Sequence, residues 1–216
     1  RDRSVSGSVI FTLSGGSVSC LAGTPVQAIA AAPWGSIYFG GGVSELAGTS
    51  TRMIGQWNGN FGTLTNGTVN DTVEDLYLNR GGTLVAGGRF TSAGGTSAWN
   101  AALWVGGAWG TLTNQGASGA GSMNSRVDVI AEGLDGRLYF GGRFGSAGGT
   151  AASRIASWNG TFGTLSTGMG GVINFGVDAL AFGLDGILYA GDAFGTAGSI
   201  VVNNTAQWNG VQWTAM

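Results

Sequence analysis

Apolar and polar residues alternate along the chain in short runs that return in the same order four times. Each repeat opens with an alternating run, and a turn that contains glycine separates it from a second run, which ends in Gly-Gly in three of the four repeats. Alternation with a period of two, bounded by glycine, asparagine and aspartate, predicts half-buried β-strands. No stretch has a sustained helical period with helix caps. The first runs begin at Val26, Val73, Val127 and Val177.

Two further runs complete each repeat after a glycine-rich connector. The connector reads RFTSAGGT at 89–96 and RFGSAGGT at 143–150, and it is degenerate at 42–49 and 193–200. The third run ends at a tryptophan, and the fourth carries an aromatic residue followed three positions later by an aliphatic one. The four tryptophans are Trp57, Trp104, Trp158 and Trp208. Asn-Gly follows three of them and favours a tight hairpin turn.

The two landmarks of each repeat keep a constant separation. The Gly-Gly step lies at residues 40, 87, 141 and 191, and the tryptophan follows at the same distance every time. Differences in repeat length therefore fall in one loop per repeat, the longest being 113–125.

A four-stranded meander of this length cannot bury both of its faces alone, and stacking such sheets face to face around an axis solves that problem. We therefore predict an all-β fold, a β-propeller of four-stranded blades with four complete repeats and an N-terminal half repeat. The number of blades stays open: four, five, or a segment of a larger propeller. The expected divisions are 1–25 for the half blade, then 26–71, 72–125, 126–175 and 176–216 for blades 1 to 4. In the half blade, Leu13 is expected at the tryptophan position and Val18 at the aromatic position.

The motifs Gly-Gly-x-Phe-x-Ser-Ala-Gly-Gly, Trp-Asn-Gly and aromatic-x-x-Leu resemble the repeats of secreted bacterial and bacteriophage tail-associated β-propellers. They are also similar to the repeats of fungal cortical-marker proteins and, more distantly, of kelch-type propellers. The resemblance covers about residues 8–216 and departs at Val43, which replaces the connector phenylalanine. It implies a propeller on an extracellular or virion surface, such as a phage tail or fibre.

Composition excludes most catalytic chemistry. The 216 residues include 44 glycines, no histidine and one cysteine, Cys20, and all nine cations are arginine. There is thus no Ser–His–Asp triad, Schiff-base lysine, imidazole or thiolate zinc site, or internal disulfide. The net charge of −2 without a basic cluster argues against nucleic-acid binding, and no apolar run is long enough for a membrane span. We expect no enzyme, no cofactor and no metal.

The second position of the first run is polar in every repeat. It holds Gln27, Glu74, Asp128 and Asp178. Since the first strand of a blade lines the central channel, one interpretation is an acidic ring that binds a cation. The favoured interpretation is structural, because arginine follows the Gly-Gly step where this position is acidic in two repeats. We expect ion pairs between Glu74 and Arg89 and between Asp128 and Arg143.

Acids that break the repeat pattern are candidates for cleaving a glycoside, which needs two carboxylates about 5–10 Å apart. They are Glu45, Asp71, Asp75, Glu132 and Asp192. None pairs with another in an evident site, so solvated or turn-forming acids are the favoured interpretation.

Sugar binding favours exposed aromatic side chains beside amides. Trp34 and Trp99 lie outside the repeated tryptophan position, and Asn114 and Gln115 belong to the longest loop. Packing between blades is the competing role for the two tryptophans. Three functions remain: a non-enzymatic structural or adhesion module that contacts protein chains or a host surface, a carbohydrate-binding propeller, and a glycan-cleaving enzyme. The expected partners are other protein chains of an assembly or a surface glycan.

Overall fold

A computed structural model describes residues 12–13, 16–19, 25–43, 45–46, 49–50, 53–64, 66–114, 122–171 and 176–216. Residues 12–13, 16–19, 45–46 and 49–50 are described by their backbone alone. Every regular element in these ranges is a β-strand, so they hold no helix able to cross a membrane. The all-β class is confirmed. The chain divides into two compact units, residues 1–111 and 112–216.

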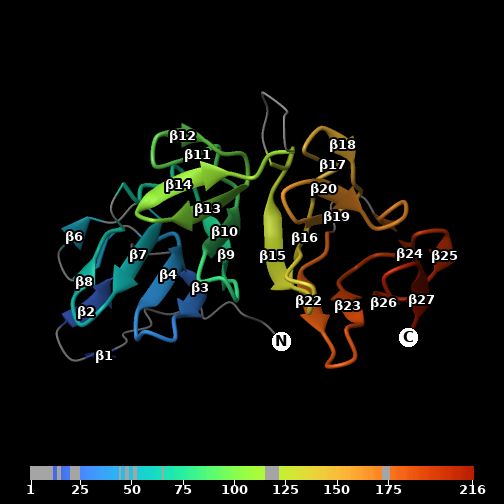
Figure 1. Ribbon diagram of the computed structural model, residues 1–216, viewed down its shortest axis with the longest axis horizontal. Coiled ribbons are helices and arrows are strands. Elements are labelled where there is room, and N and C mark those ends of the chain that lie inside the picture. The colour runs from blue at the N-terminus through green and yellow to red at the C-terminus, as the bar shows by residue number, and fades with distance from the viewer. Residues whose placement is uncertain are drawn as a thin grey trace. The chain divides into compact units, whose positions relative to one another are not determined.

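Four antiparallel meanders of four strands form the body of the two units (Figure 1). We number these sheets 1 to 4 in chain order; sheets 1 and 2 belong to the first unit, and sheets 3 and 4 to the second. Sheet 1 holds β3 (Val26–Ala31), β4 (Ile37–Gly41), β7 (Ile54–Trp57) and β8 (Phe61–Gly62). Sheet 2 holds β9 (Val73–Leu78), β10 (Leu84–Gly88), β13 (Ala101–Val105) and β14 (Ala108–Thr111). Sheet 3 holds β15 (Val127–Glu132), β16 (Leu138–Gly142), β19 (Ile155–Trp158) and β20 (Phe162–Thr164). Sheet 4 holds β22 (Ala179–Phe182), β23 (Leu188–Gly191), β26 (Thr205–Trp208) and β27 (Trp213–Ala215).

The repeated tryptophan has the same strand partners in every sheet. It lies opposite an aliphatic residue of the second strand and an aromatic residue of the fourth, as in the pairs Leu188↔Trp208 and Trp208↔Trp213. The other three sets are Ile37↔Trp57↔Phe61, Leu84↔Trp104↔Trp109 and Leu138↔Trp158↔Phe162. The four sheets are therefore equivalent in register, as the constant spacing of the landmarks predicts.

The turn between the first and second strands also repeats. A glycine with φ between 77° and 91° donates its N–H to the carbonyl three residues earlier, as Gly136 does to Gly133. The other three turns use Gly35, Gly82 and Gly186. Asp-Gly, Gly-Gly and Trp-Gly thus form the same kind of turn, because only its glycine needs a positive φ.

The glycine-rich connectors are strands, which the sequence analysis did not predict. Each folds into a two-stranded hairpin: β5 (Glu45–Leu46) with β6 (Thr49–Ser50), β11 (Ser92–Ala93) with β12 (Thr96–Ser97), β17 (Ser146–Ala147) with β18 (Thr150–Ala151), and β24 (Thr196–Ala197) with β25 (Ile200–Val201). Each hairpin pairs with the segment that leads in from the preceding repeat, as Val69 does with Ala93 and β21 (Met169–Gly170) with β24. The connectors therefore link successive repeats by main-chain hydrogen bonds.

The expected register of the N-terminal half blade is wrong. β1 (Thr12–Leu13) pairs with β2 (Gly16–Ser19), and β2 pairs with β5, with Val18 opposite Leu46. Val69 lies opposite Ala93 in the same way in the next repeat. Val18 thus occupies the lead-in segment and not a fourth strand. Residues 1–11 and 20–24 of this half blade lie outside the described residues.

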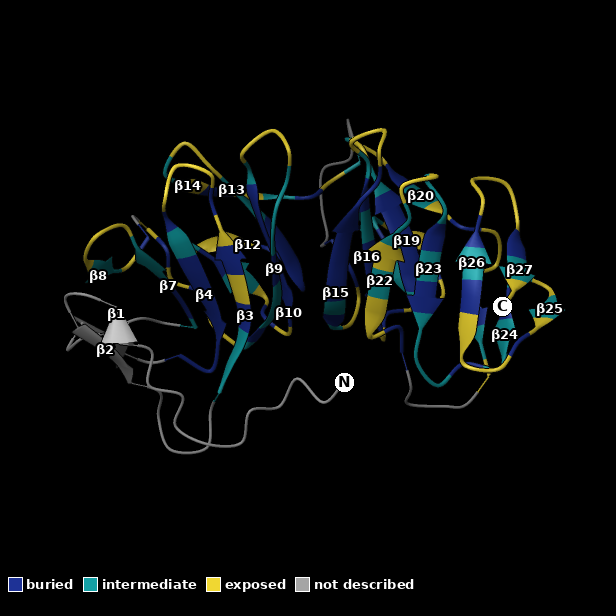
Figure 2. Cartoon of the chain, turned by 90° about the horizontal axis from the view of Figure 1, so that it is seen from below, coloured by how far each residue is buried: buried dark blue, intermediate teal, exposed yellow. Residues whose placement is uncertain are grey.

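Each unit has a core between its two sheets, with the inner strands buried and the turns exposed (Figure 2). In the first unit, Tyr38 and Ile54 of sheet 1 share a cluster with Val73 and Leu84 of sheet 2. In the second unit, Val129 and Ile155 of sheet 3 share a cluster with Val177, Leu188 and Trp208 of sheet 4.

The Gly-Gly step lets backbones approach closely. A Cβ built on Gly40 would lie 2.7 Å from Cγ1 of Val73 in sheet 2, and one on Gly141 would lie 2.8 Å from Cγ1 of Val177 in sheet 4. The first glycine is therefore where the neighbouring sheet inserts its valine. At the second glycine, a Cβ on Gly88 would collide with the carbonyl oxygen of Thr72, which precedes the first strand of its own sheet.

Gly40→Ala is predicted to lower the free energy of unfolding by about 1–3 kcal/mol, because the new methyl group overpacks the contact with Val73. Gly62→Ala in the same sheet is the control: no atom lies within 4 Å of its built Cβ, and the expected change is within about 0.5 kcal/mol. Urea unfolding measures both values. Equal effects of the two substitutions would contradict the close approach of the sheets.

Candidate functional site

The repeated polar position lies on a β-bulge. Between β3 and β4 the pairs Val26↔Gly41 and Ala28↔Gly40 leave Gln27 without an opposite residue, and Glu74 and Asp128 are skipped in the same way in sheets 2 and 3. In sheet 4 the equivalent Asp178 precedes β22 and donates its N–H to the Gly191 carbonyl. Bulges redirect side chains and are common beside functional sites. These four bulge residues are therefore the first candidate site.

In the first unit, the Glu74 carboxylate binds two partners. Arg89 Nε donates to Oε1 at 2.7 Å, and Gln27 Nε2 donates to Oε2 at 2.6 Å. The Glu74 side chain is 11% exposed and that of Arg89 is 51% exposed. Because Gln27 comes from sheet 1 and Glu74 from sheet 2, this cluster also joins two sheets.

In the second unit, the Asp128 carboxylate lies between two guanidinium groups. Arg143 Nε is 3.6 Å from Asp128 Oδ2, and Arg126 Nε forms an ion pair with Oδ1. The side chain of Asp128 is only 6% exposed. The sequence analysis missed Arg126, which stands two residues before Asp128 and has no equivalent in the other repeats. Asp178 is exposed, since Ala193 replaces the arginine of its repeat.

This arrangement removes the ligands that a cation ring would need. Glu74 and Asp128 are each neutralised by arginine, and Gln27 donates from its amide. Among the residues that the structure describes, no group of three or more His, Cys, Asp or Glu side chains is placed to hold a metal.

Three of the acids outside the repeat pattern accept hydrogen bonds from backbone N–H groups. Asp71 accepts from the N–H of Thr72 at 2.6 Å, Asp75 from that of Leu76 at 2.9 Å, and Asp192 from that of Gly176 at 3.2 Å. Glu132 is buried, and the side chain of Glu45 lies outside the described residues. Asp71, Asp75 and Asp192 therefore each have a backbone partner in the fold.

Of the residues chosen as ligand contacts, Asn114 is used by the fold itself. Its Oδ1 accepts from the N–H of Phe162 at 2.7 Å, and its Nδ2 donates to the Gly148 carbonyl at 2.8 Å. Each polar atom of its amide thus binds the backbone, which gives Asn114 a structural role, and its role as a ligand contact stays a prediction. Gln115 lies outside the described residues.

The two candidate tryptophans are exposed but belong to opposite ends of their sheets. Trp34 is 59% exposed on the turn between β3 and β4. Trp99 is 45% exposed in the connection between β12 and β13, where its Nε1 donates to Ser97 Oγ at 3.2 Å. They therefore do not form one binding site.

Exposed apolar side chains recur at one end of the sheets. We call this the turn end: it carries the turns that join the first strand to the second and the third to the fourth. Each of the four sheets exposes at least one large apolar residue there, and the set is Trp34, Val105, Leu134, Leu184 and Val211. The side chains of two of them reach the next turn. A Cβ built on Gly82 would lie 3.4 Å from Cη2 of Trp34, and one on Gly186 would lie 3.6 Å from Cδ1 of Leu134.

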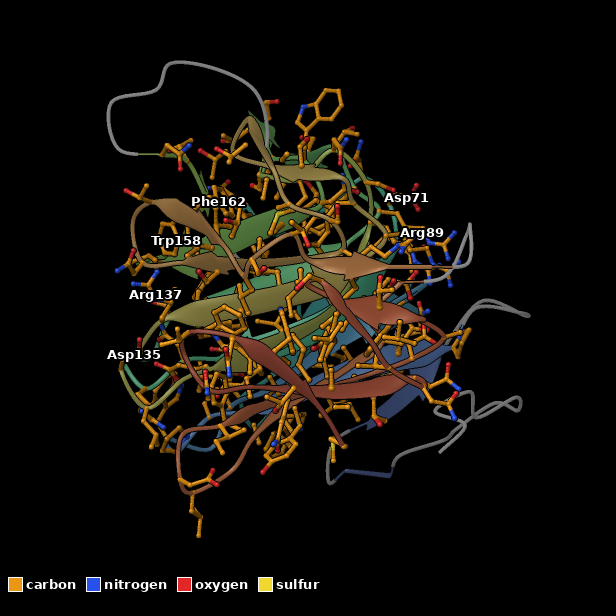
Figure 3. The ribbon with its side chains drawn as sticks, turned by 90° about the vertical axis from the view of Figure 1, so that its right-hand side faces the viewer. Asp71, Arg89, Asp135, Arg137, Trp158 and Phe162 are labelled. Carbon is orange, nitrogen blue, oxygen red and sulfur yellow. The ribbon has the colours of Figure 1, made fainter. Side chains whose placement is uncertain are left out.

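Tyr139, which follows the first turn of sheet 3, has a raised pKa. Asp135 and Arg137 on this turn are 3.6 Å apart, and they lie near Trp158 and Phe162 of the same sheet (Figure 3). The Tyr139 ring packs edge-on against Phe182 of sheet 4, with centroids 5.0 Å apart. Burial raises the pKa of the Tyr139 phenol, and the Asp135 charge raises it further, while Arg137 acts in the opposite direction.

No protein-family model matches the sequence, and no curated protein matches it. Two solved structures from B. thetaiotaomicron are similar in fold. One is the extracellular domain of a protein described as a one-component system, with a TM-score of 0.53 and 9% identity over 88% of this chain. The other is the extracellular domain of a protein described as a hybrid two-component system, with a TM-score of 0.50 and 13% identity over 86% of this chain. This chain spans 22% of the length of each, and at these identities the likeness concerns the fold alone.

Asp128→Ala is predicted to lower the free energy of unfolding by about 3–5 kcal/mol, because two guanidinium groups lose the buried carboxylate that they share. Asp178→Ala is the matched control at the same repeat position, where an exposed side chain makes the expected change less than about 0.5 kcal/mol. Chemical denaturation measures both. A loss at Asp128 no larger than that at Asp178 would contradict the structural role of the cluster.

The raised pKa of Tyr139 predicts a pH dependence of stability. Since the folded state holds this proton more tightly, the stabilisation is complete below the ordinary tyrosine pKa of about 10 and is lost as the pH rises through the folded value. Tyr139→Phe keeps the ring and is expected to flatten the alkaline decline in the free energy of unfolding. Tyr189→Phe, at the same position of sheet 4, is the control and should retain the decline. If the free energy of unfolding of Tyr139→Phe falls with rising pH as steeply as that of the parent, Tyr139 is not the cause of the decline.

Proposed function

We propose that this chain is part of a β-propeller that acts as a non-enzymatic contact module on an extracellular or virion surface. Its sheets would form the propeller blades, and its turn end would meet another protein or a host surface. The observation that carries the proposal is the recurrence of exposed apolar side chains on the turns of all four sheets, whereas the described polar candidates hold the fold together.

In each unit, an exposed apolar side chain of the turn end reaches the turn of the neighbouring sheet. Contiguous exposed apolar surface on a soluble protein marks contact sites more often than chance positions do. Leu184 and Val211 of sheet 4 are 101% and 81% exposed, and they project from its two turns. Within each unit, the near-equivalent turns of two successive sheets would provide more than one weak contact at once, which raises the strength of binding to a repetitive surface.

The extracellular location is supported by the two similar structures, both of which are extracellular domains of bacterial proteins. The sequence fits that setting, because it has a single cysteine and a surface rich in small polar residues. The virion location is supported by the resemblance of the repeats to phage tail-associated propellers.

The absence of catalysis is supported by how the acids are used. Asp71, Asp75 and Asp192 accept hydrogen bonds from backbone N–H groups close by, which suits turn and strand-end capping. Glu74 and Asp128 are engaged by arginine and would have to leave their ion pairs to act on a substrate.

Carbohydrate binding is the second candidate, and the exposure of Trp34 favours it. An indole ring that is 59% exposed on a turn can stack on the apolar face of a sugar ring. Trp99 offers a second, separate aromatic surface.

Trp34→Ala combined with Leu184→Ala is predicted to weaken binding of the labelled chain to whole bacterial cells by about tenfold or more, because each substitution removes a large exposed apolar side chain from the turn end of one unit. Val201→Ala, which removes an 83% exposed residue outside the turn end, is the control and should bind as the parent does. Flow cytometry on intact cells measures this, and a glycan array with the same variants tests the carbohydrate alternative.

The outcomes separate the three functions. Cell binding that depends on the turn end, without binding to defined sugars, supports the contact module. Binding to defined sugars that is lost in Trp34→Ala or Trp99→Ala alone indicates the carbohydrate-binding role. Release of reducing sugar from a glycan, abolished by one acid-to-amide substitution, would overturn the non-enzymatic proposal, as would a chain that binds no surface at all.

A further inference from the structure

One face of sheet 4 is exposed. Its residues match those by which sheet 1 packs against sheet 2. In sheet 1, Ala28, Ala30 and Tyr38 are 5%, 7% and 3% exposed because they pack against sheet 2. The equivalent residues of sheet 4 are Ala179, Ala181 and Tyr189. Both alanines are exposed and the tyrosine is half-buried. With Gly191 and Gln207, these residues make up what we call the sheet-4 face.

No side chain of a neighbouring sheet packs against Gly191 among the described residues. Gly40 and Gly141 each receive a valine of the next sheet, Val73 or Val177, both of which are fully buried. At Gly191 a built Cβ meets only the Cβ of Ala179 in its own sheet, at 3.8 Å. Among the described residues, no valine enters the position that valine fills at the other two glycines.

Sheet 1 carries the complementary surface. Val26 is the counterpart of Val73 and Val177, and it is only half-buried. Ile29 is 50% exposed, whereas its counterpart Leu76 is 5% exposed. With Ala31, Ile37 and Trp57, these residues form what we call the sheet-1 face. Both β3 and β22 show exposed segments, in contrast to β15 and β16, which are mostly buried (Figure 2).

We propose that the sheet-4 face of one chain binds the sheet-1 face of a second copy, with Val26 seated over Gly191. The contact resembles the two sheet interfaces inside the chain, which have tyrosine and glycine on one side and valine and leucine on the other, with Ile29 in the place of leucine. Because the two faces differ, the contact is heterologous, and its repetition gives a closed ring or a filament. Thr205 stands where Ile54 lies in sheet 1 and Ile155 in sheet 3, so this interface is more polar than the two internal ones. A more polar interface is typical of association that can be reversed.

The test is the mass of the purified chain over a range of concentrations, measured by light scattering and by sedimentation. The parent chain is expected to associate beyond its 21.6 kDa monomer as its concentration rises. Ala181→Arg and Ile29→Arg each place a charge in the contact and are expected to weaken association by about 100-fold or more. Val211→Arg adds the same charge at the turn end and should associate as the parent does.

Mixing the two variants tests that the faces differ. Ala181→Arg retains an intact sheet-1 face, and Ile29→Arg retains an intact sheet-4 face. The mixture should therefore form 1:1 dimers although neither variant associates alone. Gln207→Arg, on the same face as Ala181, replaces Ala181→Arg if that variant unfolds, and circular dichroism checks the fold of each.

A parent chain that stays monomeric at every concentration overturns the proposal, whatever else covers the sheet-4 face. So does association that survives both arginine variants, or a mixture that does not form dimers. The inference is independent of the contact function of the turn end, because Val211→Arg affects the turn end and Ala181→Arg the sheet-4 face.

Discussion

The structure depends on how closely one sheet approaches the next. At the first glycine of the Gly-Gly step the absence of a Cβ leaves a hollow, and a valine of the following sheet fills it, as Val73 does at Gly40 and Val177 at Gly141. At these two contacts, one in each unit, the hollow and the valine fix the register between the paired sheets as well as their distance, because a buried valine in any other position would leave a void. The large aromatic residues then fill the wider space beyond this contact. Tyr139 against Phe182 and Trp208 beside Trp213 are examples in the second unit.

The same approach explains why polar residues gather at one end of the sheets. The second glycine admits the backbone that precedes the first strand, and the bulge that follows turns one polar side chain out of the regular alternation. A carboxylate placed there is shielded from water, and arginine offsets the cost of shielding it. Asp128 needs two arginines at 6% exposure, while Asp178, with none, stands in solvent. The end with the bulges therefore carries ion pairs in sheets 2 and 3, while the turn end exposes at least one large apolar side chain in each of the four sheets.

The sequence was sufficient for the strands of the four meanders and for one arginine partner each of Glu74 and Asp128, because those features repeat in register, but not for Gln27 or Arg126. The sequence was insufficient where the same residues fit two different local structures. The connectors look like loops because glycine is rare inside strands, yet the hairpins that they form need glycine at their tight turns, as at Gly94 and Gly95 with φ of 59° and 79°. Asn114 was chosen as a ligand contact because it lies in a variable loop, and nothing in its spacing announces the two backbone groups that it binds. Val18 was misplaced because a valine fits the lead-in segment and the fourth strand equally well.

Repetition also separates the residues under structural constraint from those free to serve function. The glycine of the first turn is kept in each repeat, whereas the turn end presents Trp34, Leu134 and Leu184 at or beside the same place in three sheets. The turn tolerates this variation because its hydrogen bonds come from the backbone and from one glycine, so the neighbouring side chain is unconstrained by the fold. A large apolar side chain in contact with water gains nothing for stability there. Large apolar side chains recur at the turn end, and the packing of the sheets does not explain them. Contact between this end and a binding partner explains them better.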